Sequence, residues 1–469
     1  MSTYPIKTTL PSIPWWKSPA KLVRSSWFLL FGDITILFFS QMIVAKYRSG
    51  ASPGLSSLTG YEPLLITLFV GAYHLAGLYG LAKKTGAQLL IEMGAAGFMV
   101  AAVGGLSDYL LPGAGFGRRF LWPELFLVLG LGFLLRLSAA GLASNAASLR
   151  KVLVVADPAD AAELHQALAA RPGFTLAGYL STDDSASVPV PWLGTPDHLA
   201  MVVAQLRPAE IVFGTRGDNL GEEIRRSLLR HRFAGISVSD LASFYQRVSG
   251  TTPLSCVDDQ WLLWANGFEL VGNSRVQRLK RLIDFLLASV GMIVSTPIML
   301  LVAAAIKLDS RGPVFYRQQR VGFREKPFEL LKFRSMTADS MHDGQARWTD
   351  IQDRRVTRVG RFIRRTHLDE LPQFWNVLRG EMSFVGPRPE QVPITWKLRQ
   401  LTPYYSFRHS VRPGITGWAQ IHNGYCGSDE DSLKKLEYDL YYVQHMSLPM
   451  DISIVFHTIF VVLTAQGSR

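Results

Sequence analysis

Two neighbouring acidic residues directly follow the most basic stretch of the chain. Residues 354–365 read RRVTRVGRFIRR, six arginines in twelve residues without an acid, and Asp369 and Glu370 lie within the next five. Two such carboxylates can take separate roles in a phosphoryl transfer, because one can attack phosphorus while the other holds a divalent cation. We expect the arginines and a helix N-terminus to keep Asp369 ionised without a general base. Simple capping of a helix by this pair is the alternative.

The arginine cluster at residues 354–365 must face anions. Its single aromatic residue is Phe362, and the chain contains no motif typical of nucleic-acid readers, so we expect no nucleic-acid partner. Lipid headgroups and phosphate esters fit better, because the inner leaflet of a membrane is negatively charged. A solvated basic face is the alternative.

Two further segments combine an arginine with a rigid turn. Residues 386–390 read GPRPE, so Arg388 is fixed between Pro387 and Pro389. A guanidinium held in this way is suited to bidentate phosphate recognition or to stacking on a base, although a plain turn is the alternative. Residues 412–418, RPGITGW, repeat the combination of a basic group, a tight turn and an aromatic side chain.

The composition indicates a membrane protein with a basic C-terminal part. Of the 469 residues, 48% are hydrophobic and only 18% are charged, against roughly 25% in ordinary soluble proteins. Intrinsic disorder is therefore excluded, and most of the net charge of +12 lies in the last 200 residues or so. The two cysteines, Cys256 and Cys426, are too few for a disulfide framework and have no zinc-ligand spacing.

Four apolar runs precede the first α/β pattern, at residues 27–45, 64–82, 89–106 and 120–137. Each approaches the ~20 residues that a helix needs to cross a bilayer. We therefore expect a cytoplasmic segment over residues 1–25 and a four-helix transmembrane bundle over residues 26–140, with four buried core helices as the alternative. Lysines and arginines favour a cytoplasmic location for both ends of the bundle. Ionisable residues in these runs, such as Asp33 and Glu124, are expected to be paired or to lie at helix ends.

An α/β pattern follows over residues 150–255. Strand-like runs at 152–156, 174–180, 210–213 and 235–238 alternate with helix-like runs at 159–170 and 220–232. This alternation is typical of a parallel sheet and resembles a Rossmann-like fold. Since no G-x-G-x-x-G turn follows the first strand, we expect a structural, oligomerising or regulatory role instead of dinucleotide binding.

A fifth apolar run, at about 282–306, follows a linker over residues 256–274 and contains Thr296 and Pro297. Proline must kink or break a helix, and the preceding hydroxyls can bond to the carbonyls that it frees. Both flanks of the run are basic, so charge bias places both ends on the cytoplasmic side. We therefore expect a re-entrant membrane helix, with a kinked spanning helix as the alternative.

Six sequence features now carry a family resemblance. They are the apolar helix interrupted at Thr296-Pro297, FYRQ at 315–318, KFRSM at 332–336, DELPQ at 369–373, GPRP at 386–389 and RPGITGW at 412–418. In this order they resemble the bacterial polyprenyl-phosphate hexose-1-phosphate transferases, or monotopic phosphoglycosyl transferases. The preceding spans and the Rossmann-like module resemble the large undecaprenyl-phosphate glucose phosphotransferase subclass. The Thr-Pro pair replaces the more usual Ser-Pro of this family.

The resemblance implies a membrane bundle, a Rossmann-like α/β domain and an α/β monotopic catalytic domain over residues 275–469. It implies that Asp369 is the nucleophile, that Glu370 binds Mg²⁺, that Arg364 contacts the lipid or transferring phosphate and that Arg388 contacts the nucleotide. Further phosphate or nucleotide contacts implied by position are Lys332, Arg334 and Arg412.

The implied reaction moves sugar 1-phosphate from a UDP-sugar to undecaprenyl phosphate and releases UMP, as the first membrane step of exopolysaccharide or capsule synthesis. Glucose is favoured by overall architecture alone. The implied location is the bacterial inner membrane, multi-pass, with the catalytic domain on the cytoplasmic face, in contact with membrane lipids and as a homodimer. A glycosyltransferase that releases UDP and a non-catalytic scaffold or regulator are the alternatives.

Overall fold

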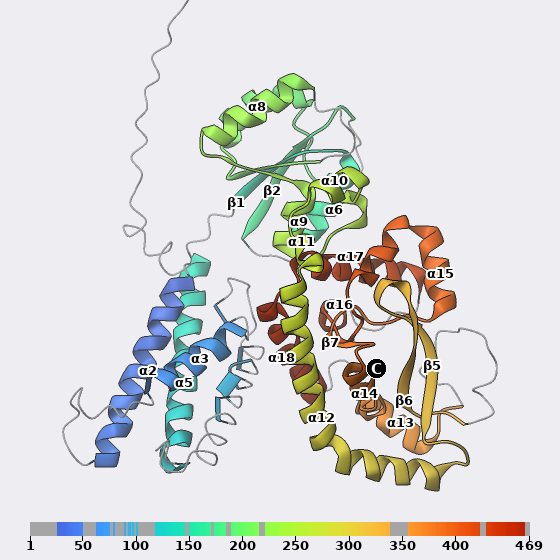
Figure 1. The fold of residues 1–469 in the computed structure, drawn as a ribbon. Helices are drawn as coiled ribbons and strands as arrows, with labels where there is room; N and C mark the ends of the chain where they lie inside the picture. Colours follow the sequence, from blue (N-terminus) through green and yellow to red (C-terminus); the bar gives the residue numbers. More distant parts are fainter. Residues whose placement is uncertain are drawn as a thin grey trace, which may run out of the picture. The chain divides into compact units, whose positions relative to one another are not determined.

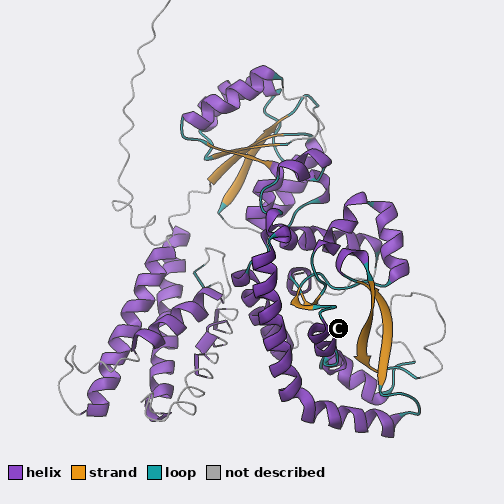
Figure 2. Ribbon diagram, viewed as in Figure 1, coloured by secondary structure: helices purple, strands orange, loops and turns teal. Residues whose placement is uncertain are grey.

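The computed structural model describes most of the chain after residue 25 (Figure 1). The described residues are 26–49, 62–75, 78–79, 89–90, 92–94, 96–97, 100–101, 118–145, 150–169, 173–183, 189–214, 221–337, 355–422 and 428–464. They form two compact units, an N-terminal helical unit and a larger unit that contains the α/β module and the C-terminal domain. Figure 2 shows the helical N-terminal unit and the mixed helices and strands of the larger one.

The N-terminal unit contains the helices α2 (Ser26–Ser49), α3 (Glu62–Leu75) and α5 (Arg118–Asn145). These helices match the first, second and fourth apolar runs, whereas much of the third run lies outside the described residues. Among the described residues, two helices are long and apolar enough to cross a membrane, Trp122–Ala139 within α5 and α12 (Ser274–Asp309) of the second unit. The bundle of four spans therefore stays a prediction.

A buried ion pair joins α2 and α5. Both terminal nitrogens of Arg136 donate to the carboxylate of Asp33, at 2.9 and 2.8 Å, and the guanidinium lies over the Tyr73 ring. Desolvated charges are costly unless they are paired and hydrogen-bonded. Asp33 thus occupies a paired position inside the bundle, as we expected.

The α/β module has a four-stranded sheet in the order β2-β1-β3-β4, in which β1, β3 and β4 run parallel. Its elements are β1 (Arg150–Val155), α6 (Pro158–Ala169), β2 (Phe174–Leu180), η3 (Pro196–His198), α7 (Leu199–Leu206), β3 (Glu210–Phe213), α8 (Glu222–Phe233), β4 (Ser237–Asp240) and α9 (Leu241–Ser249). The parallel α/β prediction is therefore confirmed. The strand order is that of flavodoxin-like doubly wound sheets, whereas the dinucleotide-binding order is 3-2-1-4.

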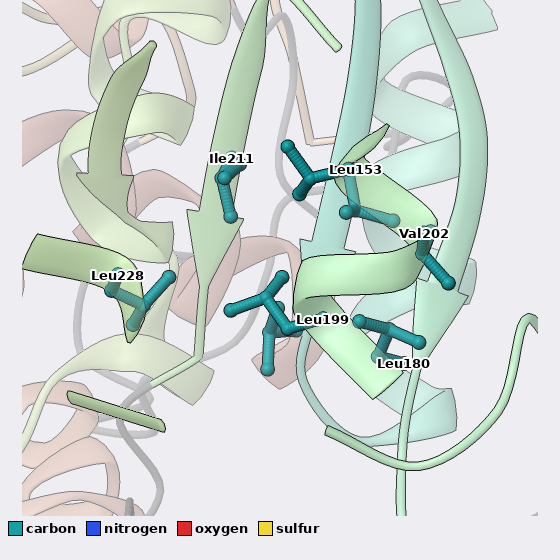
Figure 3. Packing of buried hydrophobic residues seen from close by; sticks show 8 residues of the cluster. Leu153, Leu180, Leu199, Val202, Ile211 and Leu228 are labelled. Atoms are coloured by element: carbon teal, nitrogen blue, oxygen red, sulfur yellow. The ribbon is translucent and has the colours of Figure 1, made fainter. Parts of the chain in front are cut away.

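One face of this sheet is closed by α7 and α8. Leu153 of β1 and Ile211 of β3 meet Leu199 of α7 and Leu228 of α8 in a buried cluster (Figure 3). Because side chains alternate along a strand, Val152 and Val154 point to the opposite sheet face, and both are fully buried. Covering of both faces explains why the first strand is apolar at every position from Val152 to Val155.

Short helices connect this module to the C-terminal domain, namely η4 (Leu254–Cys256), α10 (Asp259–Trp264) and α11 (Glu269–Gly272). The C-terminal domain then contains α12, β5 (Phe315–Val321), η5 (Phe323–Glu325), β6 (Pro327–Phe333), α13 (Arg358–Arg365), η7 (Leu368–Glu370), α14 (Gln373–Arg379), β7 (Ser383–Val385), α15 (Val392–Leu401), η8 (Pro403–Ser410), β8 (Gly414–Thr416), α16 (Trp418–His422), α17 (Asp429–His445) and α18 (Leu448–Thr464). β5 and β6 form an antiparallel hairpin, and β7 pairs with β8 in parallel.

Helix α12 is a single bent helix. It spans 36 residues with Pro297 inside, and Figure 1 shows a sharp turn with α13 and α14 on its inner side. The Thr296 and Ser295 hydroxyls both donate to the Met292 carbonyl, at 2.7 and 3.4 Å. The carbonyl that Pro297 leaves without its helical partner is that of Ile293, so these bonds are one residue away from the one we predicted. Since proline removes one helical hydrogen bond and clashes with the preceding turn, we attribute the bend to Pro297.

The two arms of α12 pack on different parts of the domain. Ala288, before the bend, belongs to the buried cluster of Leu330 and Val377, whereas Val302, after it, packs with Ile363. The bend therefore lets one helix cover the segment between α13 and α14 from two sides.

Polar residues fix the first arm of α12 to the domain. Asp284 accepts a hydrogen bond from the Phe384 amide at 2.9 Å, and Lys280 pairs with Asp451 of α18 at 2.5 Å. Arg281 donates to the carbonyls of Val377 and Leu378 at the end of α14. Part of the basic flank of this helix thus serves contacts within the protein.

Candidate active site

The acidic pair lies on η7, a short turn between α13 and α14. Thr357 caps the start of α13 by accepting the Gly360 amide at 2.9 Å, and Ile363 anchors the helix in the core. A Cβ at Gly360 would lie 2.0 Å from the Ser335 carbonyl oxygen, so only glycine allows this approach. His367 then adopts φ 56°, a left-handed conformation that redirects the chain, and Asp369 is buried two residues later.

Two basic groups hold the Glu370 carboxylate. Oε1 lies 2.7 Å from Lys332 Nζ of β6 and 2.5 Å from a terminal nitrogen of Arg388. Burial opposes the charge of Glu370, but Arg388 and Lys332 outweigh burial and lower the pKa of Glu370 well below its usual range. Glu370 is therefore an anion with a fixed orientation, and it positions Lys332 and Arg388 in turn.

The carboxylate of Asp369, the residue before Glu370, has a different environment. Its exposed fraction is 8%, and among the described residues its carboxylate has no hydrogen bond or ion pair. Burial raises the pKa of Asp369, with Glu370 acting in the same direction and Lys332, Arg364 and Arg388 against it. We expected the arginines to keep Asp369 ionised. Arg364 and Arg388 do lower its pKa, but desolvation outweighs them, so its ionisation stays a prediction. The result is an unengaged carboxylate close to three cations.

Arg364 is the member of the arginine cluster that acts most directly on Asp369. It is half-buried, whereas Arg358, Arg361 and Arg365 are exposed, and it lowers the pKa of Asp369. Within the described part of the chain the Arg364 guanidinium makes no hydrogen bond or ion pair. It is therefore free to bind a phosphate next to Asp369.

The Gly-Pro-Arg-Pro segment presents Arg388 to Glu370. Pro387 and Pro389 are buried and Arg388 is half-buried between them. The Gly386 amide donates to the Thr416 carbonyl at 2.9 Å, and the Gly414 amide donates to that of Pro387 at 3.0 Å. Pairing of β7 with β8 thus fixes the start of this segment, and the 412–418 motif serves as its support.

The structure does not bring Arg334 and Arg412 to the carboxylate pair. The Arg334 guanidinium is buried and donates to the carbonyls of Ser310 and Arg311, both at 2.7 Å, at the end of α12. Arg412 donates from Nε to the Gly380 carbonyl at 3.1 Å and lies over the Phe323 ring. Both arginines satisfy carbonyls at helix ends, and their contact with a phosphate or nucleotide stays a prediction.

Two basic residues near the site were not predicted from the sequence. Arg320 donates to the Pro389 carbonyl at 3.1 Å, and Arg408 donates to the Arg388 carbonyl at 2.8 Å. Neither residue has a local signal that separates it from other arginines of this domain. Arg408 lies next to His409 and four residues before Arg412, but its acidic partner Asp439 is on α17.

The carboxylate pair has the chemistry of a magnesium site that is completed by substrate. Among the described residues, no group of three or more His, Cys, Asp or Glu side chains is placed to hold a metal ion. Protein Mg²⁺ is usually held by one or two carboxylates together with substrate phosphates. Asp369 and Glu370 supply that number of carboxylates, so they fit a Mg²⁺ ion that arrives with a diphosphate.

Comparison with known proteins gives the family. The model of bacterial sugar transferases matches residues 275–465. The exopolysaccharide production protein PSS of Rhizobium leguminosarum bv. phaseoli is 41% identical over 192 residues, which are 40% of this chain and 96% of that protein. The chain belongs to the bacterial sugar transferase family. The transferase region, residues 275–465, contains all of α12 except its first residue, both carboxylates and every basic residue described at this site.

Two longer relatives carry more specific names. The UDP-N-acetylgalactosamine-undecaprenyl-phosphate N-acetylgalactosaminephosphotransferase of Aeromonas hydrophila is 40% identical over 259 residues, 55% of this chain and 60% of that protein. The UDP-glucose:undecaprenyl-phosphate glucose-1-phosphate transferase of Klebsiella pneumoniae is 48% identical over 185 residues, 39% of each chain. The match to the Aeromonas protein is longer than the transferase region and so includes residues outside it. The chain thus spans 60% and 39% of these two relatives.

Proposed function

We propose that this protein transfers sugar 1-phosphate from a UDP-sugar to undecaprenyl phosphate, and that Asp369 carries the phosphosugar between the two substrates. The observation that supports this assignment is the contrast between the two carboxylates. Glu370 is paired with Lys332 and Arg388, whereas Asp369 is buried without a partner beside the same cations. An anion that is desolvated and unengaged is a stronger nucleophile than one that is already hydrogen-bonded.

In the first half-reaction, an Asp369 carboxylate oxygen attacks the β-phosphorus of the UDP-sugar. A bond forms between this oxygen and phosphorus, and the bond from the β-phosphorus to the bridging oxygen breaks, so that UMP leaves with that oxygen. Three negative charges are present before and after the step, and no proton has to move. The reaction therefore needs ionised Asp369 but no general base.

In the second half-reaction, a phosphate oxygen of undecaprenyl phosphate attacks the same phosphorus. The bond to Asp369 breaks, the carboxylate is regenerated, and undecaprenyl diphosphate sugar is formed. Both steps bring anions together, so fixed positive groups must stabilise the transition states. We assign this role to Arg364 and Arg388 because both act electrostatically on Asp369, and Lys332 would orient Glu370.

Glu370 would hold Mg²⁺ together with the phosphate oxygens of the donor. Bound there, Mg²⁺ would neutralise charge on the transferring phosphate as a Lewis acid. Glu370 is suited to a hard cation because its pKa is lowered and it stays ionised throughout the physiological range.

For the sugar, we propose glucose first and N-acetylgalactosamine second. The Klebsiella relative is named for glucose and is 48% identical, whereas the Aeromonas relative is named for N-acetylgalactosamine and matches over a longer part of this chain. The product would begin a lipid-linked exopolysaccharide or capsule.

For the membrane disposition, we propose that α12 enters and leaves the cytoplasmic leaflet on one side, with its bend at Pro297. The many exposed apolar residues of α12, such as Ile293, Val294 and Leu301, support its insertion into lipid. Cysteine labelling before residue 282 and after residue 306 in sealed inverted and right-side-out vesicles tests this disposition. Periplasmic labelling after residue 306 would exclude it.

The decisive test of the activity uses a panel of UDP-sugars with undecaprenyl phosphate and Mg²⁺. We expect UMP release with one sugar and transfer of label from the β-phosphate to Asp369 when the lipid acceptor is omitted. Release of UDP would instead indicate a glycosyltransferase. Unchanged function of the Asp369→Asn variant without any nucleotide release would indicate a scaffold.

A further inference from the structure

We propose that Arg408, held by Asp439, is a positioning residue that fixes the backbone of Arg388 and thereby aims the Arg388 guanidinium at Glu370 and the donor. This inference rests on the proposed function and adds a residue that does not itself touch the carboxylate pair. It depends on three observations about the segment from Arg388 to Glu390.

First, three successive carbonyls of this segment accept hydrogen bonds, one from η8 and two from β5. Arg408 of η8 donates to the Arg388 carbonyl at 2.8 Å, Arg320 of β5 donates to that of Pro389 at 3.1 Å, and the Val321 amide donates to that of Glu390 at 3.0 Å. The two prolines restrict φ at their own positions and the conformation of the residue before each, Gly386 and Arg388. The orientation of the segment as a whole is set by these three bonds.

Second, Arg408 is itself fixed. Its guanidinium is 3% exposed, forms an ion pair with Asp439 at 2.7 Å and donates to the Tyr405 hydroxyl at 2.6 Å. The guanidinium also lies over the Tyr405 ring. A planar guanidinium can serve three partners in fixed directions, whereas a lysine ammonium is a point charge on a flexible stem.

Third, the residue that Arg408 fixes also contacts the carboxylate pair through its side chain. The bond from Arg408 ends on the residue whose side chain binds Glu370 at 2.5 Å. Glu390, at the other end, is held between Arg320 at 3.6 Å and Lys435 at 3.7 Å. A buried charge pair is weak evidence for stability, but it can fix a unique conformation, which is the role proposed here.

The test is a double-mutant cycle between Arg408 and Arg388 on the full-length protein. Arg408→Lys keeps the charge beside Asp439 but cannot reach all three partners. In the wild-type background we expect a roughly tenfold loss of kcat/KM for the UDP-sugar, and in the Arg388→Ala background a loss of less than about twofold. Equal losses in both backgrounds would mean that Arg408 acts independently of Arg388 and would overturn the proposal.

The control is Lys280→Arg, a conservative change in another buried ion pair, Lys280–Asp451, of the same domain. Its effect on kcat/KM should be the same with and without Arg388. A loss of stability alone would lower kcat/KM by the same factor with and without Arg388, whether it came from Arg408→Lys or from Lys280→Arg. A loss that depends on Arg388 therefore indicates positioning and not folding.

Hydrogen exchange supplies a readout that does not depend on activity. Amide protection over residues 383–392 should fall in Arg408→Lys and stay at the wild-type level in Lys280→Arg. If wild-type protein released no UMP, the proposed function would fail, and the exchange result would still decide the positioning role. Unchanged protection in Arg408→Lys would refute that role even in an active enzyme.

Discussion

Arg388 and Glu370 are 18 residues apart in the chain, and a terminal nitrogen of Arg388 lies 2.5 Å from Glu370 Oε1. Lys332 binds the same carboxylate. Because Glu370 is held by these two cations, it is the poorer nucleophile of the two neighbouring acids, and Asp369 is the carboxylate without a hydrogen bond among the described residues. Adjacent residues of similar chemistry thus differ in role because their surroundings differ.

Asp369→Asn should abolish UMP release without loss of stability. Removing a nucleophile costs more than ~10³-fold in rate. Since burial raises the pKa of Asp369, an uncharged amide at this position should unfold at the same temperature as wild type or higher. UMP assays and thermal unfolding check both points. A variant with normal turnover would remove the basis of the proposed mechanism.

The fall in the rate of UMP release at low pH should follow the protonation of Asp369. Its pKa is raised from 3.8, so the nucleophilic anion is lost at a higher pH than for an ordinary aspartate. Arg364→Met removes a group that lowers this pKa and should move the fall to still higher pH. UMP release measured from pH 4 to 8 checks the shift, and a fall that moves to lower pH would contradict it.

Arg334 and Arg364 should behave oppositely when replaced. Arg334→Met leaves the carbonyls at the end of α12 unsatisfied and should lower the free energy of unfolding by about 3 kcal/mol. Arg364→Ala breaks no hydrogen bond or ion pair among the described residues, so it should largely preserve stability and reduce turnover. Denaturant unfolding with parallel UMP assays separates the two effects. Loss of turnover at full stability in Arg334→Met would restore a direct role for Arg334.

Glycine should be better than alanine at position 367. His367 is exposed and has φ 56°, which costs an L residue roughly 1–2 kcal/mol. His367→Gly should therefore unfold at a higher temperature than His367→Ala, the reverse of the usual order, and His367→Val should be the least stable. Thermal unfolding of the three variants gives the order directly.

Glu437 should make stability depend on pH at the contact between the α/β module and α17. Burial, opposed by the Leu254 amide that donates to it and assisted by Glu163, raises the pKa of Glu437 from 4.5 to about 7. Between these values the unfolded chain loses the proton and the folded protein keeps it, so stability falls as pH rises. It then stays level above the folded-state pKa.

Glu437→Gln keeps the acceptor for Leu254 and should remove this fall. At pH 8 the variant should be more stable than wild type by on the order of 3 kcal/mol, and below pH 4.5 the difference should vanish. Denaturant unfolding at both pH values is the measurement. Parallel stability curves across this range would show that Glu437 titrates normally.

Local pattern determined much of this protein in advance. The strands at 174–180 and 210–213 follow the expected ranges, because β-branched runs between helical stretches specify a parallel sheet without reference to distant residues. Pro297 specified a bend, because its missing N–H acts on its own helix. The order of short motifs from residue 315 to residue 418 was enough to indicate the family.

Tertiary structure decided which charged groups meet. Arg334, Arg388 and Arg412 are equivalent as sequence, yet only Arg388 reaches Glu370, while the other two satisfy carbonyls at helix ends. The raised pKa of Asp369 was equally hidden, because desolvation depends on what folds over a residue and not on its neighbours in the chain. The sequence determines which residues can carry a charge. Which groups each charged side chain pairs with, and how far it is exposed to water, is determined only when distant segments pack together.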